Sequence, residues 1–227
     1  HLNQASVNVN IYTDGSIGVA ISAVEMGQGI TEKIRTVVAR CFDLPQDLIR
    51  IDYTNSSKTA NMSPTAASVG ADLNGMAAWQ ACTALKKRLC EFASTQLQVP
   101  TENLELNAGK FCVTQKNSDD NSNHRSDREA SAIEWTDLIS RAYLARINLA
   151  EHAYYATPDL YFDRTREQGN PFAYHVYGVS AIEATLDSLL GVYTVDTIDV
   201  VYDLGESLDP QSDLGQMEGG LVQGVGY

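Results

Sequence analysis

The sequence is poor in basic residues. Only 16 of its 227 residues are Lys or Arg, against 29 Asp or Glu, so the formal net charge is −13. A nucleic-acid backbone needs clustered cations on its partner, and an anionic lipid surface needs a basic segment. The charge balance therefore argues against nucleic acid and against a membrane as partners. A small anionic cofactor stays compatible, because it contacts local amide groups rather than the charge of the whole chain.

The chain also has few side chains suited to binding metals, and no apolar run long enough to span a bilayer. Its four cysteines form no Cys-x-x-Cys pair, and its four histidines are scattered along the sequence. A metal site made by the protein's own side chains is therefore not expected. The cysteines are interpreted as reduced thiols, as in a cytoplasmic protein.

Several common catalytic signatures are missing. The sequence contains no P-loop, no Gly-x-Gly-x-x-Gly after a strand, no Gly-x-Ser-x-Gly and no His-Glu-x-x-His. Ser68 has no His or Asp near it that would complete a triad. The acidic residues Asp72, Glu183 and Asp187 are interpreted as helix-cap, sheet-edge or solvated positions rather than general bases.

The first half of the chain has patterns typical of a mixed fold. Hydrophobic residues make up 44% of the sequence, which is ordinary for a globular protein. Residues 6–13 and 17–24 predict two strands joined by a turn at 14–16. An apolar face predicts a helix from residue 30 to 41, capped by Thr31, and a strand follows at 48–54. A long Ala-rich helix is expected from about Ala66 or Asp72 to Leu97, and a small hairpin is expected at 104–114.

The second half is richer in strand patterns. A helix is predicted over 134–145, with Trp135, Leu138, Ile139 and Tyr143 on its apolar side. Strands are predicted at 147–157, 173–188 and 192–203, and a loop from Asp213 is expected to enter a last helix. The predicted fold is α+β with two mixed subdomains. Residues 1–116 form a βαβ-like N-terminal subdomain, 117–131 an exposed polar loop, and 132–227 a strand-rich, truncated C-terminal subdomain.

Three segments combine small residues and neutral amides just before a predicted helix. They are residues 25–29 (EMGQG), 63–70 (SPTAASVG) and 214–220 (LGQMEGG). Small residues let a ligand approach the backbone, and a helix start offers unpaired N–H groups that suit an anion. The three turns are therefore predicted to form one pocket for a large anionic cofactor. The alternative is that they are ordinary tight turns and helix caps.

The order of these motifs resembles the molybdenum-cofactor-binding region of the xanthine dehydrogenase and aldehyde oxidase family. The resemblance rests on residues 12–16 (YTDGS), 25–29 and 59–75 (TANMSPTAASVGADLNG), continuing with 156–158 (ATP), 177–178 (YG), 203–205 (DLG) and 213–219 (DLGQMEG). It covers nearly the whole chain and is weakest over 94–133. The motif order is most similar to the separate molybdenum subunit of bacterial xanthine dehydrogenases.

The resemblance implies a molybdopterin whose dithiolene ligates molybdenum, so that no protein side chain binds the metal directly. Within the family's motifs, Gln28, between Gly27 and Gly29, would hydrogen-bond the pterin or its phosphate. Thr65 and Ser68, with the backbone of Ala66 and Ala67, would line the cofactor and the molybdenum side of the cavity. Gln216 would hold another edge of the cofactor.

The resemblance also implies that the chain is a fragment of a larger enzyme. The family's catalytic glutamate lies in a Gly-Glu-Pro segment expected downstream, so no catalytic residue is assigned here. The remaining molybdenum-domain segments, iron–sulfur clusters and FAD are expected on other domains or subunits. The implied reaction is oxidative hydroxylation of a purine (hypoxanthine or xanthine). The alternatives are an aldehyde oxidase-type enzyme or a noncatalytic cofactor-binding scaffold.

The sequence departs from the family pattern at three places. Residues 21–24 (ISAV) stand where relatives often have His-Gly-Gly-Thr, which removes two glycines from the loop before Glu25. Gly70 replaces a serine of some relatives, and Asp209 precedes Pro210 where Asn is more usual.

Overall fold

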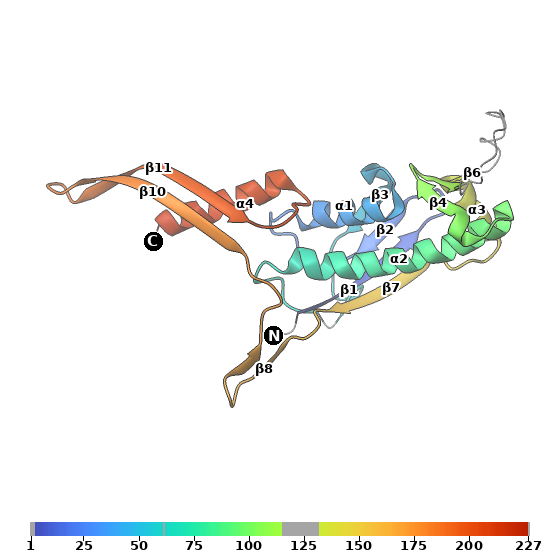
Figure 1. The fold of residues 1–227 in the computed structure, drawn as a ribbon, viewed down its shortest axis with the longest axis horizontal. Helices are drawn as coiled ribbons and strands as arrows, with labels where there is room; N and C mark the ends of the chain where they lie inside the picture. Colours follow the sequence, from blue (N-terminus) through green and yellow to red (C-terminus); the bar gives the residue numbers. More distant parts are fainter. Residues whose placement is uncertain (1–2, 61, 115–131, 227) are drawn as a thin grey trace, which may run out of the picture.

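The main sheet of the protein has four strands. The computed structural model describes residues 3–60, 62–114 and 132–226. The strand order is β3-β2-β1-β7, with β1 at Gln4–Ile11, β2 at Ile17–Ala20, β3 at Ile49–Asp52 and β7 at Ala150–Ala156 (Figure 1). β1 is antiparallel to β2 and β7, whereas β2 and β3 are parallel and joined through α1 (Ile30–Phe42). The predicted α+β class and the βαβ-like start are confirmed.

The first hairpin turns where Asp-Gly-Ser predicts it. Asp14 Oδ1 accepts hydrogen bonds from Ser16 N at 2.9 Å and Ser16 Oγ at 2.7 Å, and these bonds lower the pKa of the exposed Asp14 carboxyl. Gly15 adopts φ +86°, which favours glycine. The return strand is shorter than the predicted 17–24. It ends at Ala20, and beyond it the Ser22 hydroxyl, in place of backbone groups, accepts from Ser6 N and donates to Ser6 O of β1.

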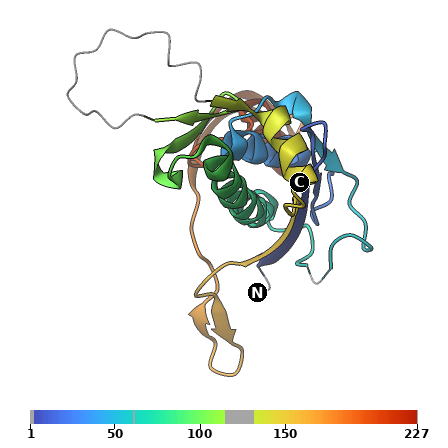
Figure 2. The same cartoon turned by 90° about the vertical axis from the view of Figure 1, so that its right-hand side faces the viewer.

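Two helices, α1 and α2 (Gly70–Leu97), cover one face of this sheet (Figure 2). Alternate residues of β1, among them Val7 and Val9, point to that face and are fully buried, as the period of a strand requires. The buried face of α2 is rich in alanine, including Ala77 and Ala81. Gly75 lies inside α2 without breaking it, and a side chain there would contact Val37.

A smaller unit closes the far end of the helices. It contains β4 (Leu104–Asn107), β5 (Lys110–Val113), β6 (Ala132–Glu134) and α3 (Trp135–Leu144). A 3₁₀ turn at Thr101–Asn103 directly precedes β4, and another at Gln46–Leu48 precedes β3. The predicted 104–114 hairpin is confirmed. Trp135, Leu138 and Ile139 are buried as predicted, but Tyr143 is 60% exposed. Tyr143 lies in the last turn of α3, where Ala142 takes the buried position.

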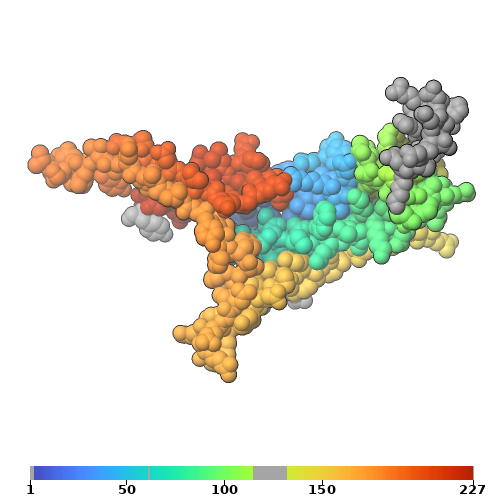
Figure 3. All heavy atoms as spheres, viewed as in Figure 1, coloured from blue at the N-terminus to red at the C-terminus, as the bar shows by residue number. Residues whose placement is uncertain are grey.

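The C-terminal part extends away from this body as an arm, which we define as residues 177–226 (Figures 1 and 3). It consists of the antiparallel strands β10 (Tyr177–Asp187) and β11 (Val192–Asp203) and the helix α4 (Pro210–Val225). All residues of β10 are exposed. A short hairpin, β8 (Tyr161–Asp163) and β9 (Gln168–Asn170), precedes the arm.

The last helix begins earlier than predicted. Asp213 was expected in a loop, but α4 begins at Pro210 with Asp209 as its N-cap, whose side chain accepts from Ser212 N. Asp followed by Pro is a sequence signal for a helix start. The start of α4 at Pro210 could therefore have been predicted from the sequence.

The main sheet does not follow the predicted division of the chain. β7, from the 132–227 part, pairs along β1 from Gln4↔Ala156 to Asn10↔Ala150. This pairing gives β1 a partner on each edge and satisfies its backbone groups. The predicted polar loop, 117–131, lies outside the described residues.

Among the described residues, no helix combines the length and the apolar character needed to cross a bilayer. All four cysteines are free thiols, with Cys41 and Cys82 buried and Cys90 and Cys112 half-buried.

Candidate functional site

A cavity is lined by residues near the N-terminal ends of α1 and α2 and by residues of the arm. Its volume is about 1290 Å³, above the range of about 300–1,000 Å³ typical of ligand sites. Its lining includes residues from all three predicted turns, namely Gln28, Thr65, Ala66, Ala67, Ser68 and Gln216. Gly27 and Gly29 flank Gln28 in the sequence, but among the described residues they do not line the cavity.

The start of α1 holds an anion supplied by the chain itself. Glu25 Oε1 accepts from Gly27 N at 2.9 Å and Gly29 N at 3.1 Å, and Oε2 accepts from Thr31 N at 3.0 Å. Partial burial raises the pKa of Glu25, but these N–H donors and the Thr31 hydroxyl outweigh it and hold the pKa below its usual value. The predicted capping role of Thr31 was wrong: Gly29 is the N-cap, and Glu25 fills the positive end of the helix.

Gln28 shapes the same loop with its side-chain amide. Its Oε1 accepts from Met26 N at 2.6 Å, and its Nε2 donates to Val24 O at 2.7 Å. The side-chain amide of Gln28 therefore already makes two hydrogen bonds within its own loop. Because an amide has two donor hydrogens and two acceptor lone pairs, Gln28 keeps one of each for a ligand.

The turn before α2 has a strained backbone. Ala67 and Ser68 both adopt left-handed conformations, with φ +59° and +55°. Each such non-glycine residue costs about 1–3 kcal/mol, and such strain clusters at ligand sites. Thr65 Oγ1 accepts from Val24 N at 3.0 Å and ties this turn to the loop of Gln28.

Unlike α1, α2 begins without a side-chain cap. Its N-cap is Val69, whose side chain makes no capping hydrogen bond. Ser68 is therefore not the N-cap of α2. The first N–H groups of an α-helix lack intrahelical partners. The turn at 65–70 consequently presents donors to the cavity that no side-chain cap occupies.

One carboxylate at this helix start has an incomplete set of partners. Asp72 lies in the first turn of α2 and lines the cavity. Its Oδ2 accepts from the Tyr174 hydroxyl at 2.9 Å, whereas its buried Oδ1 has no hydrogen-bond partner among the described residues. Burial raises the pKa of Asp72, against an opposing effect of the Tyr174 hydroxyl. Burial and the bond to Asp72 raise the pKa of Tyr174 to about 12.

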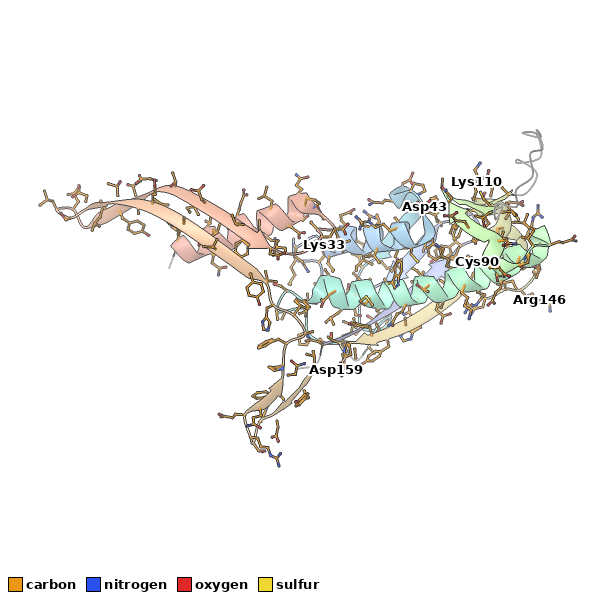
Figure 4. All side chains as sticks on the ribbon, viewed as in Figure 1. Lys33, Asp43, Cys90, Lys110, Arg146 and Asp159 are labelled. Atoms are coloured by element: carbon orange, nitrogen blue, oxygen red, sulfur yellow. The ribbon has the colours of Figure 1, made fainter. Side chains whose placement is uncertain are left out.

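The arm contributes the third side of the cavity. Gln216 lies inside α4, not in a turn before a helix, and its Nε2 donates to Gly27 O at 3.3 Å. Lys33 of α1 forms a half-buried ion pair with Asp213 of α4 at 2.5 Å. Figure 4 shows Lys33 at the end of α1 that faces the arm. A side chain on Gly29, which has φ +75°, would lie 2.7 Å from Ser212 Oγ, so glycine permits the close approach of α4.

The sequence-based interpretation missed several residues of this cavity. Asp72 is interpreted from the sequence as a cap, a sheet-edge residue or a solvated acid, Asp213 as the start of a loop, and Lys33 and Tyr174 are not singled out. Only their positions relative to the three turns could have indicated them, and the sequence does not contain that information. Glu183, by contrast, is exposed in β10 as expected. No cluster of three or more His, Cys, Asp or Glu side chains suited to a metal occurs among the described residues.

The whole chain matches a known protein family and proteins of similar sequence. The family model described as molybdopterin cofactor-binding domain matches residues 1–227. The xanthine dehydrogenase of Oryza sativa subsp. japonica is 36% identical over 226 residues, covering 100% of this chain and 14% of that protein. The xanthine dehydrogenase/oxidase of Felis catus is 35% identical over 225 residues, covering 99% of this chain and 14% of that protein. The chain thus spans about 14% of the length of these curated relatives.

Solved structures share the fold at lower sequence identity. Quinoline 2-oxidoreductase from Pseudomonas putida 86 superposes with a TM-score of 0.81 at 20% identity, covering 98% of this chain and 26% of that chain. The aldehyde oxidoreductase of Desulfovibrio gigas gives a TM-score of 0.72 at 20% identity, over 98% of this chain and 21% of that one.

Proposed function

The chain belongs to the molybdopterin cofactor-binding domain family, and from this premise we propose that it forms one wall of the cofactor site in a xanthine dehydrogenase-type molybdenum hydroxylase. The observation that carries the proposal is the meeting of three distant segments at one cavity. Gln28, Ser68 and Gln216 lie far apart in the sequence, yet all three line it. Independent turns and caps would have no reason to converge in this way.

The residues present suit a molybdopterin, which has an anionic phosphate and a heterocycle rich in donors and acceptors. The strained turn at Ala67 and Ser68 lets the cofactor approach the backbone, and the first N–H groups of α2 are donors for its acceptor atoms. Amides such as Gln28 and Gln216 suit the neutral heterocycle. The buried Asp72 Oδ1, which has no partner among the described residues, is an acceptor that fits a donor on the cofactor.

We assign the cofactor-facing roles as follows. Ser68 and the backbone of Ala66 and Ala67 contact the cofactor directly, and Thr65 fixes their turn to the neighbouring loop. Gln28 supports its own loop while offering its remaining donor and acceptor. Gln216 joins the arm to Gly27 and covers another edge. When bound, the cofactor supplies a molybdenum centre for oxidative hydroxylation, while these residues bind and orient it.

For the substrate we propose a purine, hypoxanthine or xanthine. The support is that relatives 34–36% identical over the whole chain are xanthine dehydrogenases. Iron–sulfur clusters and FAD would lie on other parts of the enzyme or on a partner subunit, in the cytoplasm. Comparing turnover of xanthine with turnover of an aldehyde by the full-length protein tests this assignment, and a preference for the aldehyde would contradict it.

Replacement of Ser68 by leucine tests the cofactor site. In the full-length protein, we expect Ser68→Leu to lose most of its molybdenum, because the larger side chain fills the turn and the lost hydroxyl leaves a polar cofactor atom unpaired, at about 1–3 kcal/mol. Ser68→Gly, which accepts φ +55° without added volume, should retain more. Molybdenum per protein is measured together with the melting temperature.

The matched control is Ser140→Leu, which makes the same change at an exposed position of α3. It should retain the wild-type molybdenum content. Full molybdenum occupancy in Ser68→Leu would contradict the proposed role of Ser68, and a lowered melting temperature in the same variant would then make that role purely structural.

A further inference from the structure

The half-satisfied carboxylate of Asp72 is the least explained polar group of the cavity. Tyr174 donates to Oδ2 at 2.9 Å, but Oδ1 is buried without a partner among the described residues. Leaving a buried acceptor unsatisfied is unfavourable. A position in the first turn of α2 explains an acid there, yet it explains neither the burial of Oδ1 nor the tyrosine on Oδ2.

Asp72 and Tyr174 come from distant parts of the chain. Asp72 lies on α2, and Tyr174 lies just before β10, and both line the cavity. Because the pKa of Tyr174 is raised to about 12, its hydroxyl keeps its proton at neutral pH and acts as a fixed donor. The bond therefore fixes one oxygen of the carboxylate and leaves the other one available to a ligand.

Resting on the proposed function, we propose that Asp72 accepts a hydrogen bond through Oδ1 from an N–H group of the pterin, with Tyr174 as the positioning residue that orients the carboxylate. A pterin ring has amino and ring N–H donors that match an acceptor-only group. The phosphate end has no such donors, and its charge would be repelled by a carboxylate. Asp72 therefore selects the heterocycle rather than the phosphate.

The other charged and titratable groups lining the cavity do not replace this role. Lys33 of α1 is already paired with Asp213 of α4. Glu206, in the loop after β11, pairs with Arg40 at 3.5 Å. The remaining titratable residues that line the cavity are two tyrosines of β11, Tyr193 and Tyr202.

Variants of the full-length protein test the proposal by cofactor content rather than by activity alone. We expect Asp72→Ala to lower pterin and molybdenum per protein about tenfold or more, since a hydrogen bond to a charged group is worth about 1.5–3 kcal/mol. Asp72→Asn keeps an acceptor oxygen and should retain an intermediate amount. Asp137→Asn, which removes the first-turn acid of α3, is the matched control and should retain all of it.

Tyr174→Phe tests the positioning role through the pH at which the protein releases its pterin, which a merely structural role of Tyr174 would not change. The Tyr174 hydroxyl lowers the pKa of Asp72, so its removal raises that pKa further. The protonated carboxyl is a poorer acceptor. The pH below which the purified protein releases its pterin should therefore be higher in Tyr174→Phe than in wild type, with near-normal content at neutral pH.

The outcomes separate this proposal from the one on which it rests. Full pterin content in both Asp72 variants, with loss in Ser68→Leu, would overturn the role of Asp72 and leave the cofactor site intact. Equal losses in Asp72→Asn and Asp137→Asn would also overturn it, because a general helix-start effect would then suffice. Absence of molybdopterin from the wild-type protein would overturn the proposed function itself.

Discussion

At the scale of single residues, the two helix starts at the cavity differ in what satisfies them. The N–H groups near the start of α1 are satisfied by the Glu25 carboxylate, so this positive helix end is not available to a ligand. The start of α2 has no side-chain cap. An acceptor atom of the cofactor consequently finds hydrogen-bond donors at the start of α2, beside the strained turn of Ala67 and Ser68.

Glu25→Gln tests the built-in anion at α1. The carboxylate has a lowered folded-state pKa, so its stabilisation is present above the usual glutamate pKa and is lost as the pH falls through the lowered value. We expect Glu25→Gln to reduce amide hydrogen-exchange protection at Gly27, Gly29 and Thr31 at neutral pH. Wild type should approach the variant in acid.

Glu32→Gln is the control for this measurement, because Glu32 lies in the same first turn but pairs with Arg35 on the helix surface. Its effect on those three amides should be small. Equal protection in wild type and Glu25→Gln at neutral pH would show that the carboxylate does not hold the loop.

At the scale of elements, α3 is fixed to the first hairpin through one side chain. The indole N–H of Trp135 donates to Gly15 O at 2.7 Å, and its ring lies 5.3 Å from that of Phe42 on α1. Trp135 is only 3% exposed. It therefore links three elements that are far apart in the sequence: β1–β2, α1 and α3.

Replacing each of the two tryptophans by phenylalanine tests this link. Trp135→Phe leaves Gly15 O buried without its donor, so we expect a loss of about 1–3 kcal/mol in the free energy of unfolding. Trp79, on α2, is 46% exposed, and Trp79→Phe should change stability by less than about 0.5 kcal/mol. Urea unfolding of both variants gives the comparison, and equal losses would contradict the linking role.

At the scale of the whole molecule, ion pairs help to hold the arm against the body. Two ion pairs join α1 to it: Lys33–Asp213, with side chains 13% and 23% exposed, and Arg40–Glu206, with side chains 55% and 86% exposed. Their geometry predicts different energies, since solvent screens an exposed pair and leaves it little net strength.

Double-mutant cycles measure the coupling free energy of each of these ion pairs. For Lys33→Met with Asp213→Asn we expect a coupling of about 1–3 kcal/mol, read from the opening free energies of α4 amides in hydrogen exchange. For Arg40→Met with Glu206→Gln we expect less than about 0.5 kcal/mol. A larger coupling in the exposed pair would show that burial does not decide how the arm is held.

The sequence by itself determined the local elements and the chemistry of the turns. Alternation gave the strands, the 3.6-residue period gave α1, and Asp-Gly-Ser gave the first hairpin, because these signals depend on neighbouring residues. Motif order also indicated the cofactor family. The errors were local too: Thr31 was given a capping role that Glu25 performs, and the Asp209–Pro210 start of α4 was passed over.

Only the tertiary structure decided which distant segments meet. β7 completes the sheet of the N-terminal part, because β1 needs a partner on its second edge. The bond from Tyr174 to Asp72 and the ion pair from Lys33 to Asp213 join residues 102 and 180 positions apart. No periodicity extends over such separations. The turns could be predicted from their own residues, but the cavity they line exists only once the arm lies against α1 and α2.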